Sequence, residues 1–228
     1  MTIKIKNQNE IFKIFGINQS YNKKPINRIK TVPEVVDKLK KLENLREKIE
    51  MIEDCELKKK ANKIVFNDGN ENSHIMFVGE GPGQREDEIG KPFVGDAGLL
   101  LNKMLNAINL KRKDIYITNV VNYRPPGNRK PETNEILKYA EFLKEHICII
   151  NPKILVLMGS TAMEALFGKK IKISKSRGEW QNLIINNKLF KTIITFHPAY
   201  LLRQPDQKRF SWEDLKKIKK EIDIISKN

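Results

Sequence analysis

The sequence predicts an α/β fold, namely a three-layer α/β/α sandwich around a mainly parallel, four-stranded central sheet. Four apolar runs of strand length, most of them rich in β-branched residues, predict the strands. Helical patterns lie between them, and strands that alternate with helices favour right-handed crossovers and parallel pairing. The predicted strands span residues 75–78, 115–121, 154–158 and 192–196.

The helices of the sandwich are predicted from apolar residues at helical spacing. A helix between the first two strands carries a stripe made of Ala97, Leu100, Leu101, Met104, Leu105 and Ile108. A second helix covers residues 135–150, and a short third helix covers residues 160–166. Asn186 and Asn187 lie between apolar flanks, which favours a hairpin over residues 180–190 that leads into the fourth strand.

The chain is predicted to divide near residue 60 into an N-terminal extension, residues 1–60, and a main domain, residues 61–228. Residues 1–32 are polar and basic, and residues 33–60 are predicted to form one charged helix. Packing of this helix on the core is favoured over binding of a partner. Its apolar stripe consists of Val36, Leu39, Leu42, Leu45 and Ile49.

The composition is strongly basic. The 228 residues include 43 Lys and Arg against 28 Asp and Glu, a formal net charge of +15. Such a charge is typical of proteins that bind a polyanion, with nucleic acid as the leading partner class. Because a genome biased towards Ile, Asn and Lys would also produce a basic chain, this interpretation needs the support of a motif.

The two cysteines, Cys55 and Cys148, predict neither a disulfide framework nor a zinc site, because neither has a second Cys or a His at zinc-finger spacing. The apolar runs are too short to span a membrane, and the N-terminus lacks the apolar core and cleavage site of a signal peptide. We expect a cytoplasmic, intracellular monomer.

Glycine or polar residues follow all four predicted strands. The segment GEGPG begins at Gly79, Asn119 lies near the end of the second strand, and Gly159 and His197 follow the third and fourth. Since carboxyl ends of parallel strands meet at one edge of a sheet, these residues are expected to line one crevice. Gly159 is better explained by a turn, whereas Glu80, Asn119 and His197 favour a functional site over separate structural roles.

Three blocks of the sequence then resemble the family 4 uracil-DNA glycosylases in order and spacing. The blocks are GEGPGQREDEIGKPFVGDAGLLL, YITNVVNYRPPGNRKP and HPAYLLR. The resemblance covers about residues 52–215 and implies the fold of the uracil-DNA glycosylase superfamily. It also implies an enzyme that binds DNA, rotates a uracil nucleotide out of the stack and hydrolyses its N-glycosidic bond, leaving an abasic site.

The resemblance assigns roles around the uracil base. Asn119 matches the residue that distinguishes uracil from cytosine, since an amide can donate to O4 and accept from N3–H. Phe93 matches the aromatic residue that stacks on the extruded base, although a core Phe is its structural alternative. Close backbone contacts are expected from Gly79, Gly81 and Gly83.

The resemblance also implies the catalytic groups. His197 would stabilise the departing uracil anion at O2, while a carboxylate would stabilise the oxocarbenium-like sugar and orient water. Glu80 is favoured for the carboxylate because it lies close to the strand end. Glu86 stays open as a second catalytic or uracil-positioning acid.

The block HPAYLLR resembles the DNA-intercalation loop of the family. Leu201 and Leu202 are the candidates for the apolar wedge that fills the gap left by the base, and Arg203 is the candidate for holding phosphate. Further backbone contacts are assigned to Arg124, Arg129 and Lys130, for which a solvated basic loop is nearly as good an explanation.

The chain departs from the family at the iron-sulfur cluster. Members of the family usually bind a four-iron, four-sulfur cluster through four cysteines, and the corresponding positions here are Ile52, Cys55, Tyr123 and Tyr139. Because a cluster needs thiolate ligands, and Cys148 falls outside the pattern, we predict no cluster and no metal.

Two alternatives to a glycosylase are considered. The first is a catalytically impaired DNA-binding homologue that keeps the fold and has lost the reaction together with the cluster. The second is a nucleotide-binding protein that uses GEGPG as a phosphate cradle. This second alternative is weaker, because the chain has neither the GxGxxG spacing nor the lysine of a P-loop.

Overall fold

The computed structural model describes residues 31–168 and 172–225, with side chains described from residue 37 onward. The sheet and the helices on its two faces belong to one compact unit, which runs from Asp37 to Asn228. Residues 1–30, which form most of the basic N-terminal segment, lie outside the described residues. No described helix has the length and apolar character needed to cross a membrane.

A six-stranded sheet in the order β1-β3-β2-β4-β6-β5 forms the centre of this unit. Its four inner strands pair in parallel, as the sequence predicts. Two antiparallel edge strands extend the predicted four-stranded sheet. The strands are β1 (Asp68–Gly69), β2 (Ile75–Gly79), β3 (Tyr116–Asn119), β4 (Ile154–Met158), β5 (Trp180–Ile185) and β6 (Lys188–Thr195).

The edge strands differ in how far the sequence reveals them. Strand β5 is the first strand of the predicted hairpin, and Asn186 and Asn187 form its turn with positive φ angles of 49° and 61°. This conformation at both turn residues is typical of a two-residue hairpin loop. Strand β1 has only two residues, too few to produce a periodic pattern.

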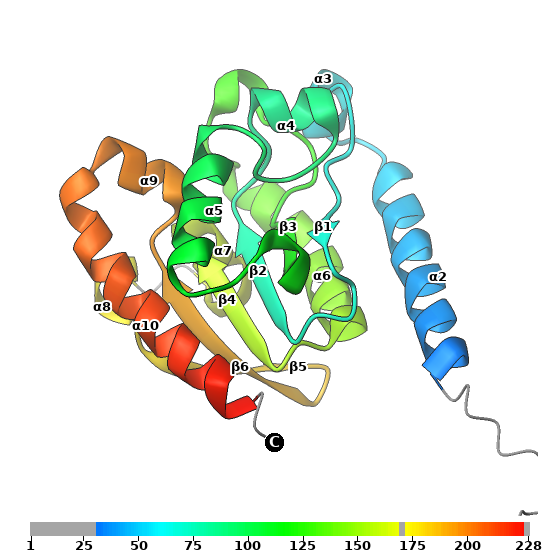
Figure 1. The fold of residues 1–228 in the computed structure, drawn as a ribbon. Helices are drawn as coiled ribbons and strands as arrows, with labels where there is room; N and C mark the ends of the chain where they lie inside the picture. The colour runs from blue at the N-terminus through cyan, green and yellow to red at the C-terminus, as the bar shows by residue number, and fades with distance from the viewer. Residues whose placement is uncertain (1–30, 169–171, 226–228) are drawn as a thin grey trace, which may run out of the picture. The chain divides into compact units, whose positions relative to one another are not determined.

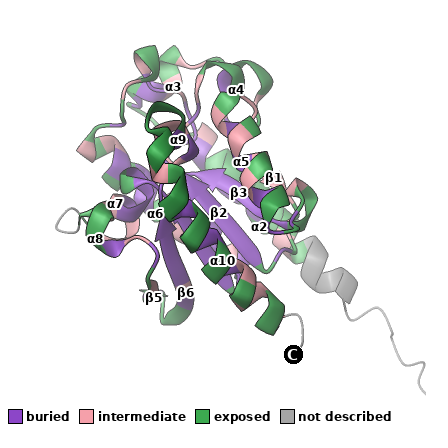
Figure 2. Ribbon diagram, turned by 60° about the vertical axis from the view of Figure 1, so that its left-hand side comes forward, coloured by how far each residue is buried: buried purple, intermediate pink, exposed green. Residues whose placement is uncertain are grey.

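Each face of the sheet carries its own hydrophobic core, which confirms the three-layer architecture (Figure 1). Residues alternate between the two cores along β4: Leu155 and Leu157 belong to one, and Ile154 and Val156 to the other. The strands β2, β3 and β4 are buried along their whole length (Figure 2).

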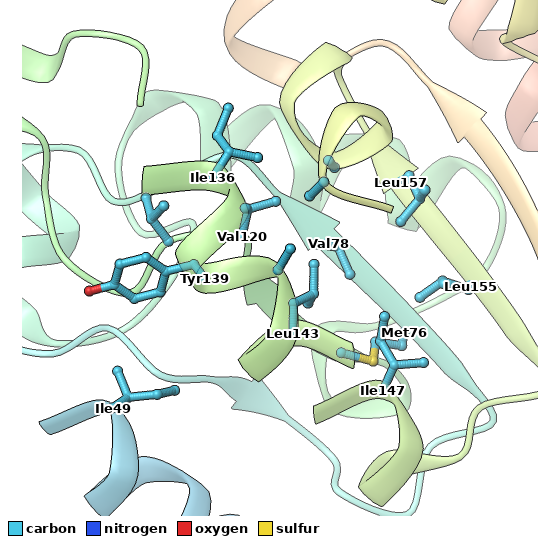
Figure 3. Packing of buried hydrophobic residues seen from close by; sticks show 14 of the residues in the cluster. Ile49, Met76, Val78, Val120, Ile136, Tyr139, Leu143, Ile147, Leu155 and Leu157 are labelled. Carbon is cyan, nitrogen blue, oxygen red and sulfur yellow. The ribbon is translucent and has the colours of Figure 1, made fainter. Parts of the chain in front are cut away.

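The helices follow the predicted order, with one large addition. Residues of α2 (Thr31–Glu50), α3 (Glu56–Lys60), α6 (Thr133–Ile150) and α7 (Ser160–Phe167) contribute to the first core (Figure 3). Residues of α5 (Asp96–Ala107) and α10 (Lys208–Ile225) contribute to the second. Helix α10 is not among the predicted helices, although its buried residues Leu215 and Ile218 recur at helical spacing. The described residues also form short helices: α4 (Gln84–Ile89), α8 (Ile173–Ser176), α9 (Pro198–Arg203), η1 (Arg112–Asp114), η2 (Pro126–Asn128) and η3 (Pro205–Gln207).

The prediction of a single helix over residues 33–60 is wrong. Helix α2 ends at Glu50, and α3 begins at Glu56 after a turn in which Asp54 has a φ of 47°. The Lys58 ammonium donates to the backbone carbonyl of Glu50, which satisfies a carbonyl left free at the helix end. Of the predicted stripe, Leu42, Leu45 and Ile49 are buried, Leu39 is exposed, and Val36 lies outside the described side chains.

Candidate active site

A cavity of about 620 Å³ opens where the four parallel strands end. Its wall contains one residue or more from each strand end, namely Glu80, Asn119, Gly159 and His197. Backbone hydrogen bonds continue past the sheet, since Val120 and Val121 donate to the carbonyls of Gly79 and Glu80. The structure thus brings together the residues that the sequence predicts at the carboxyl ends of the parallel strands.

Gly79 lies beneath two of the predicted base-contacting side chains. A Cβ atom at Gly79 would lie within 3.0 Å of both the Phe93 ring and the Asn119 amide. Phe93 and Asn119 are themselves buried, at 5% and 3% exposure. Only a residue without a side chain therefore allows the ring and the amide to occupy the same end of the cavity. Gly81 and Gly83 line the cavity.

Two buried polar atoms at this end of the cavity have no hydrogen-bond partner among the described residues. They are Oδ1 of Asn119 and Nε2 of His197. Buried polar groups in proteins are nearly always hydrogen-bonded, and leaving one unpaired costs about 1–3 kcal/mol. Both residues line the cavity, so a ligand there would supply the missing partners.

The tautomer of His197 follows from its contacts. The backbone N–H of Ala199 donates to Nδ1 over 3.2 Å, so Nδ1 is an acceptor and the ring proton is on Nε2. Burial, and to a smaller extent the charge of Arg203, lowers the pKa of His197 to about 4. At neutral pH the site therefore presents an uncharged imidazole whose free N–H can donate to a ligand.

The two candidate carboxylates have different surroundings. Glu80 is half-buried, lines the cavity and accepts a hydrogen bond from the hydroxyl of Thr161, a fully buried residue of α7. Glu86 is 8% exposed, and its Oε1 accepts from the backbone N–H groups of Val94 and Gly95 over 2.9 and 2.8 Å. Glu86 thus holds the loop that contains Phe93, and it also lines the cavity.

Comparison with known proteins agrees with this geometry. The family model described as "Uracil DNA glycosylase superfamily" matches residues 66–216. A type-4 uracil-DNA glycosylase of Thermotoga maritima is 41% identical over 78% of this chain and 93% of its own length. The chain belongs to the type-4 uracil-DNA glycosylase family. A type-4 uracil-DNA glycosylase of Saccharolobus solfataricus is 38% identical over 79% of this chain and 86% of its own length. A DNA polymerase of Bacillus phage SP01 is 32% identical over 64% of this chain and 16% of its own length.

The two leucines of the segment that resembles the intercalation loop of the type-4 family differ in exposure. Both lie on α9, where Leu201 is 1% exposed and Leu202 is 44% exposed. Arg203 at the end of α9 lines the cavity and forms no ion pair among the described residues. Leu202 is thus exposed on the same helix as Arg203, which lines the cavity, whereas Leu201 serves as core.

The basic residues of the block YRPPGNRKP are mostly engaged within the protein. Arg129 lines the cavity but donates to both carboxylate oxygens of Glu135, over 2.8 and 2.7 Å. Lys130 pairs with Glu164 over 3.2 Å. Arg124 donates to the side-chain oxygen of Asn128 and has no ion pair among the described residues. Of the three, Arg124 is therefore the one whose charge is not offset by a carboxylate.

The four positions that correspond to the cluster ligands of the type-4 family come together in the first hydrophobic core. The Cys55 sulfur lies 3.3 Å from the Tyr139 hydroxyl oxygen, and burial, followed by the charges of Glu50 and Cys55, raises the pKa of Tyr123 to about 12. Ile52 is buried in the same core. One thiol among four side chains does not fit a cluster that needs four thiolates. Within the described residues, no group of three or more His, Cys, Asp or Glu could hold a metal ion.

Side chains outside the motifs also support the site, and no sequence pattern predicts them. Arg177 pairs with the buried carboxylate of Asp214, which also accepts from the Thr195 hydroxyl over 2.7 Å. The Arg177 guanidinium lies 5.4 Å from the ring centre of Phe196, the residue before His197. These contacts hold Thr195 and Phe196 at the end of β6, next to His197 in the chain. Arg177 and Asp214 belong to no motif, so only their three-dimensional contacts reveal this role.

Proposed function

We propose that this protein removes uracil from DNA by hydrolysing the N-glycosidic bond and leaves an abasic site. The observation that carries the proposal is the pair of unpartnered polar atoms, Asn119 Oδ1 and His197 Nε2, buried beside Phe93 at the strand ends. Type-4 uracil-DNA glycosylases are the relatives most similar in length and identity among those compared above. An intracellular site of action follows from a DNA substrate.

Asn119 would select uracil by its hydrogen-bonding edge. Its unpartnered Oδ1 can accept from N3–H of uracil, while the amide N–H₂ donates to O4. Cytosine presents an acceptor at N3 and a donor at the 4-position, so both contacts would become repulsive. A site that leaves buried polar groups unpaired with the wrong base discriminates strongly against it.

Phe93 would stack on the base after it leaves the duplex. Its ring lies 5.5 Å from the His197 ring, centre to centre, at an angle of 34°, so both contribute to one wall. The base gains aromatic contacts that offset part of the cost of unstacking it from DNA. An apolar ring also excludes water from the bond that breaks.

His197 would stabilise the leaving group. As the N-glycosidic bond breaks, electrons move onto uracil, and negative charge develops on O2. The Nε2–H of neutral His197 has no other partner, so it can donate to this oxygen and strengthen the contact in the transition state. The neutral imidazole donates this hydrogen bond while its Nδ1 still accepts from the Ala199 N–H, which orients the ring.

Glu80 would act on the sugar side of the bond. Its carboxylate can stabilise the positive charge that develops on deoxyribose and orient the attacking water. The hydrogen bond from Thr161 to Oε2 fixes the carboxylate and leaves Oε1 for this task. For Glu86, the two backbone hydrogen bonds at Oε1 favour a role in positioning the Phe93 loop over a role in water activation.

The DNA contacts would come from the mouth of the cavity. Leu202 is the candidate wedge because it is exposed, and Arg203 is the candidate phosphate contact because no described carboxylate pairs with it. The formal net charge of +15 would attract the DNA backbone without sequence preference. Arg124 is the remaining candidate for a second phosphate contact, and binding as a monomer is sufficient for this arrangement.

We also propose that this member of the family works without an iron-sulfur cluster. The support for this proposal is chemical: a single thiol, Cys55, is present where four thiolates would be needed, and it contacts the Tyr139 hydroxyl. The tyrosine and isoleucine side chains fill the space as ordinary core. None of the steps above uses a metal.

The test is cleavage of labelled oligonucleotides that contain one uracil, either single-stranded or opposite guanine or adenine. Wild type should form abasic sites, whereas Asn119→Ala and His197→Ala should lose roughly 10²-fold or more of the rate. If folded wild type binds DNA in a salt-sensitive manner but does not cleave, the chain is a DNA-binding homologue that has lost the reaction.

A further inference from the structure

The backbone at Phe93 is strained. Its φ is 55°, in the left-handed region that a bulky side chain rarely adopts. Gly98 packs so closely that a Cβ atom there would collide with the backbone of Phe93. Strained conformations persist only where the surrounding structure holds them, and they gather at ligand-binding sites. Phe93 must therefore be held by its neighbours.

Arg112 holds the loop from one side. Its Nη1 donates to the backbone carbonyl of Phe93 over 2.9 Å, and its Nη2 donates to the carbonyl of Pro92. Two donors in one rigid plane define the positions of two successive carbonyl groups. The arginine thus fixes the orientation of the peptide planes that flank the strained residue.

Glu86 holds the same loop from the other side. Its Oε1 accepts from the next two backbone N–H groups, those of Val94 and Gly95. The Arg112 guanidinium therefore binds two backbone carbonyls, and the Glu86 carboxylate binds the two backbone N–H groups that follow them in the chain. Hydrogen bonds to charged groups are about twice as strong as neutral ones.

Asp68 anchors the arginine to the sheet. The Nε of Arg112 pairs with the Asp68 carboxylate, and Asp68 belongs to the edge strand β1, where it pairs with Ile117 of β3. Both side chains are partly buried, with 23% and 21% of their surface exposed. The position of the guanidinium is therefore set by the sheet, outside the motifs that line the cavity.

We propose that Arg112, anchored by Asp68, is a positioning residue that holds Phe93 in the left-handed conformation required to stack on an extruded uracil. This inference rests on the proposed function, because it takes uracil as the ligand of Phe93. Arg112 does not line the cavity itself, so it acts on the base only through Phe93.

The test is a double-mutant cycle with Arg112→Gln and Phe93→Ala. Two quantities are measured for each variant: inhibition of the enzyme by free uracil, and separate kcat and KM values for uracil-containing DNA. Arg112→Gln alone should weaken uracil binding roughly tenfold. In the Phe93→Ala background the same change should alter it by about twofold at most, because the two residues act as a unit. An equal loss in both backgrounds would overturn the inference, since it would show that Arg112 acts independently of Phe93.

Two further variants provide the controls. Lys91 lies 3.8 Å from the same Asp68 carboxylate and donates to neither carbonyl, so Lys91→Gln should leave uracil binding unchanged. If Arg112→Gln does not fold, Asp68→Asn removes the anchor and should weaken uracil binding in the same direction. If wild type neither cleaves uracil-containing DNA nor binds free uracil, the proposed function is refuted. If wild type cleaves and Arg112→Gln binds uracil normally, only this inference is refuted.

Discussion

The sulfur of Cys55 lies 3.3 Å from the hydroxyl oxygen of Tyr139, and both side chains are buried in the first hydrophobic core, which Tyr139 enters from α6 (Figure 3). In the type-4 family these two positions correspond to ligands of an iron-sulfur cluster. A hydrogen bond thus joins two side chains of which only one, the Cys55 thiol, could ligate a cluster. This contact supports the proposal that these positions form ordinary core in this protein.

Iron content tests the proposed absence of a cluster directly. Protein purified under anaerobic conditions should contain far less than one iron and one sulfide per chain and should lack the visible absorption of a cluster. Cys55→Ala should keep uracil excision and lower the free energy of unfolding by about 1–3 kcal/mol, because it leaves the buried Tyr139 hydroxyl without its partner. Stoichiometric iron and sulfide, lost in Cys55→Ala, would contradict the proposal.

The rate of uracil excision should depend on pH through His197. We expect the neutral imidazole to be the active form, because protonation of Nδ1 would remove the hydrogen bond from the Ala199 N–H that orients the ring. Burial lowers the pKa of His197 to about 4. Activity attributable to this residue should therefore be constant from neutral pH down to about pH 5 and decline as pH approaches 4. A single-turnover pH profile measures this, and a decline centred near 6.5, the ordinary histidine value, would contradict it.

Acid should also destabilise the fold, because His197 and His146 take up protons more readily in the unfolded chain. His146 is 2% exposed, its Nε2 lies 2.6 Å from the Tyr116 hydroxyl oxygen, and burial lowers its pKa to about 3. In the unfolded chain both residues bind a proton below about pH 6.5. The free energy of unfolding should therefore fall steadily between about pH 6.5 and pH 4, where unfolding takes up protons. Urea unfolding at a series of pH values measures the slope, which His146→Gln should reduce.

Substitutions of the two leucines of α9 should have different effects, one on the stability of the protein and the other on excision from duplex DNA. Leu201→Ala removes a buried side chain and should lower the free energy of unfolding by about 2–5 kcal/mol. Leu202→Ala should change stability little because the side chain is half-exposed, but it should slow excision from duplex DNA more than from single strands. Equal effects of Leu202→Ala on both substrates would mean that this residue is not the wedge.

The sequence predicts the inner sheet and the strand-end residues because both follow from local rules. Apolar runs such as residues 154–158 must be buried, and a parallel sheet places Asn119 and His197 at the same edge. The break between α2 and α3 escaped prediction because the apolar spacing continues through Ile52 and Cys55. A turn there depends on tertiary contacts such as that of Lys58 with the end of α2.

The supporting charges of the site could not be predicted for a different physical reason. Arg112, Arg177 and Asp214 have the same appearance in the sequence as any of the 43 basic and 28 acidic residues. Their roles arise from partners distant in the chain, such as the pairing of Arg112 with Asp68. Likewise, burial distinguishes Leu201 from Leu202 only once α9 is packed.

Gly79→Ala tests whether the close contact of Phe93 and Asn119 is needed for function. The added methyl would lie within 3.0 Å of both side chains, so at least one must move away from the base. Because a displacement of about 1 Å at a reacting site can cost 10²-fold in rate, excision should fall by roughly that factor. The steric strain should cost about 1–3 kcal/mol of stability, which urea unfolding measures.

The control for Gly79→Ala is binding of uracil-free DNA, for which we propose contacts at the cavity mouth and not at its base-contacting end. Its salt dependence should match that of wild type, since no phosphate contact changes. Wild-type excision by a folded Gly79→Ala would show that the ring and the amide can both shift without loss of the reaction. The base would then be recognised in a geometry different from the one in which Asn119 and His197 now face the cavity.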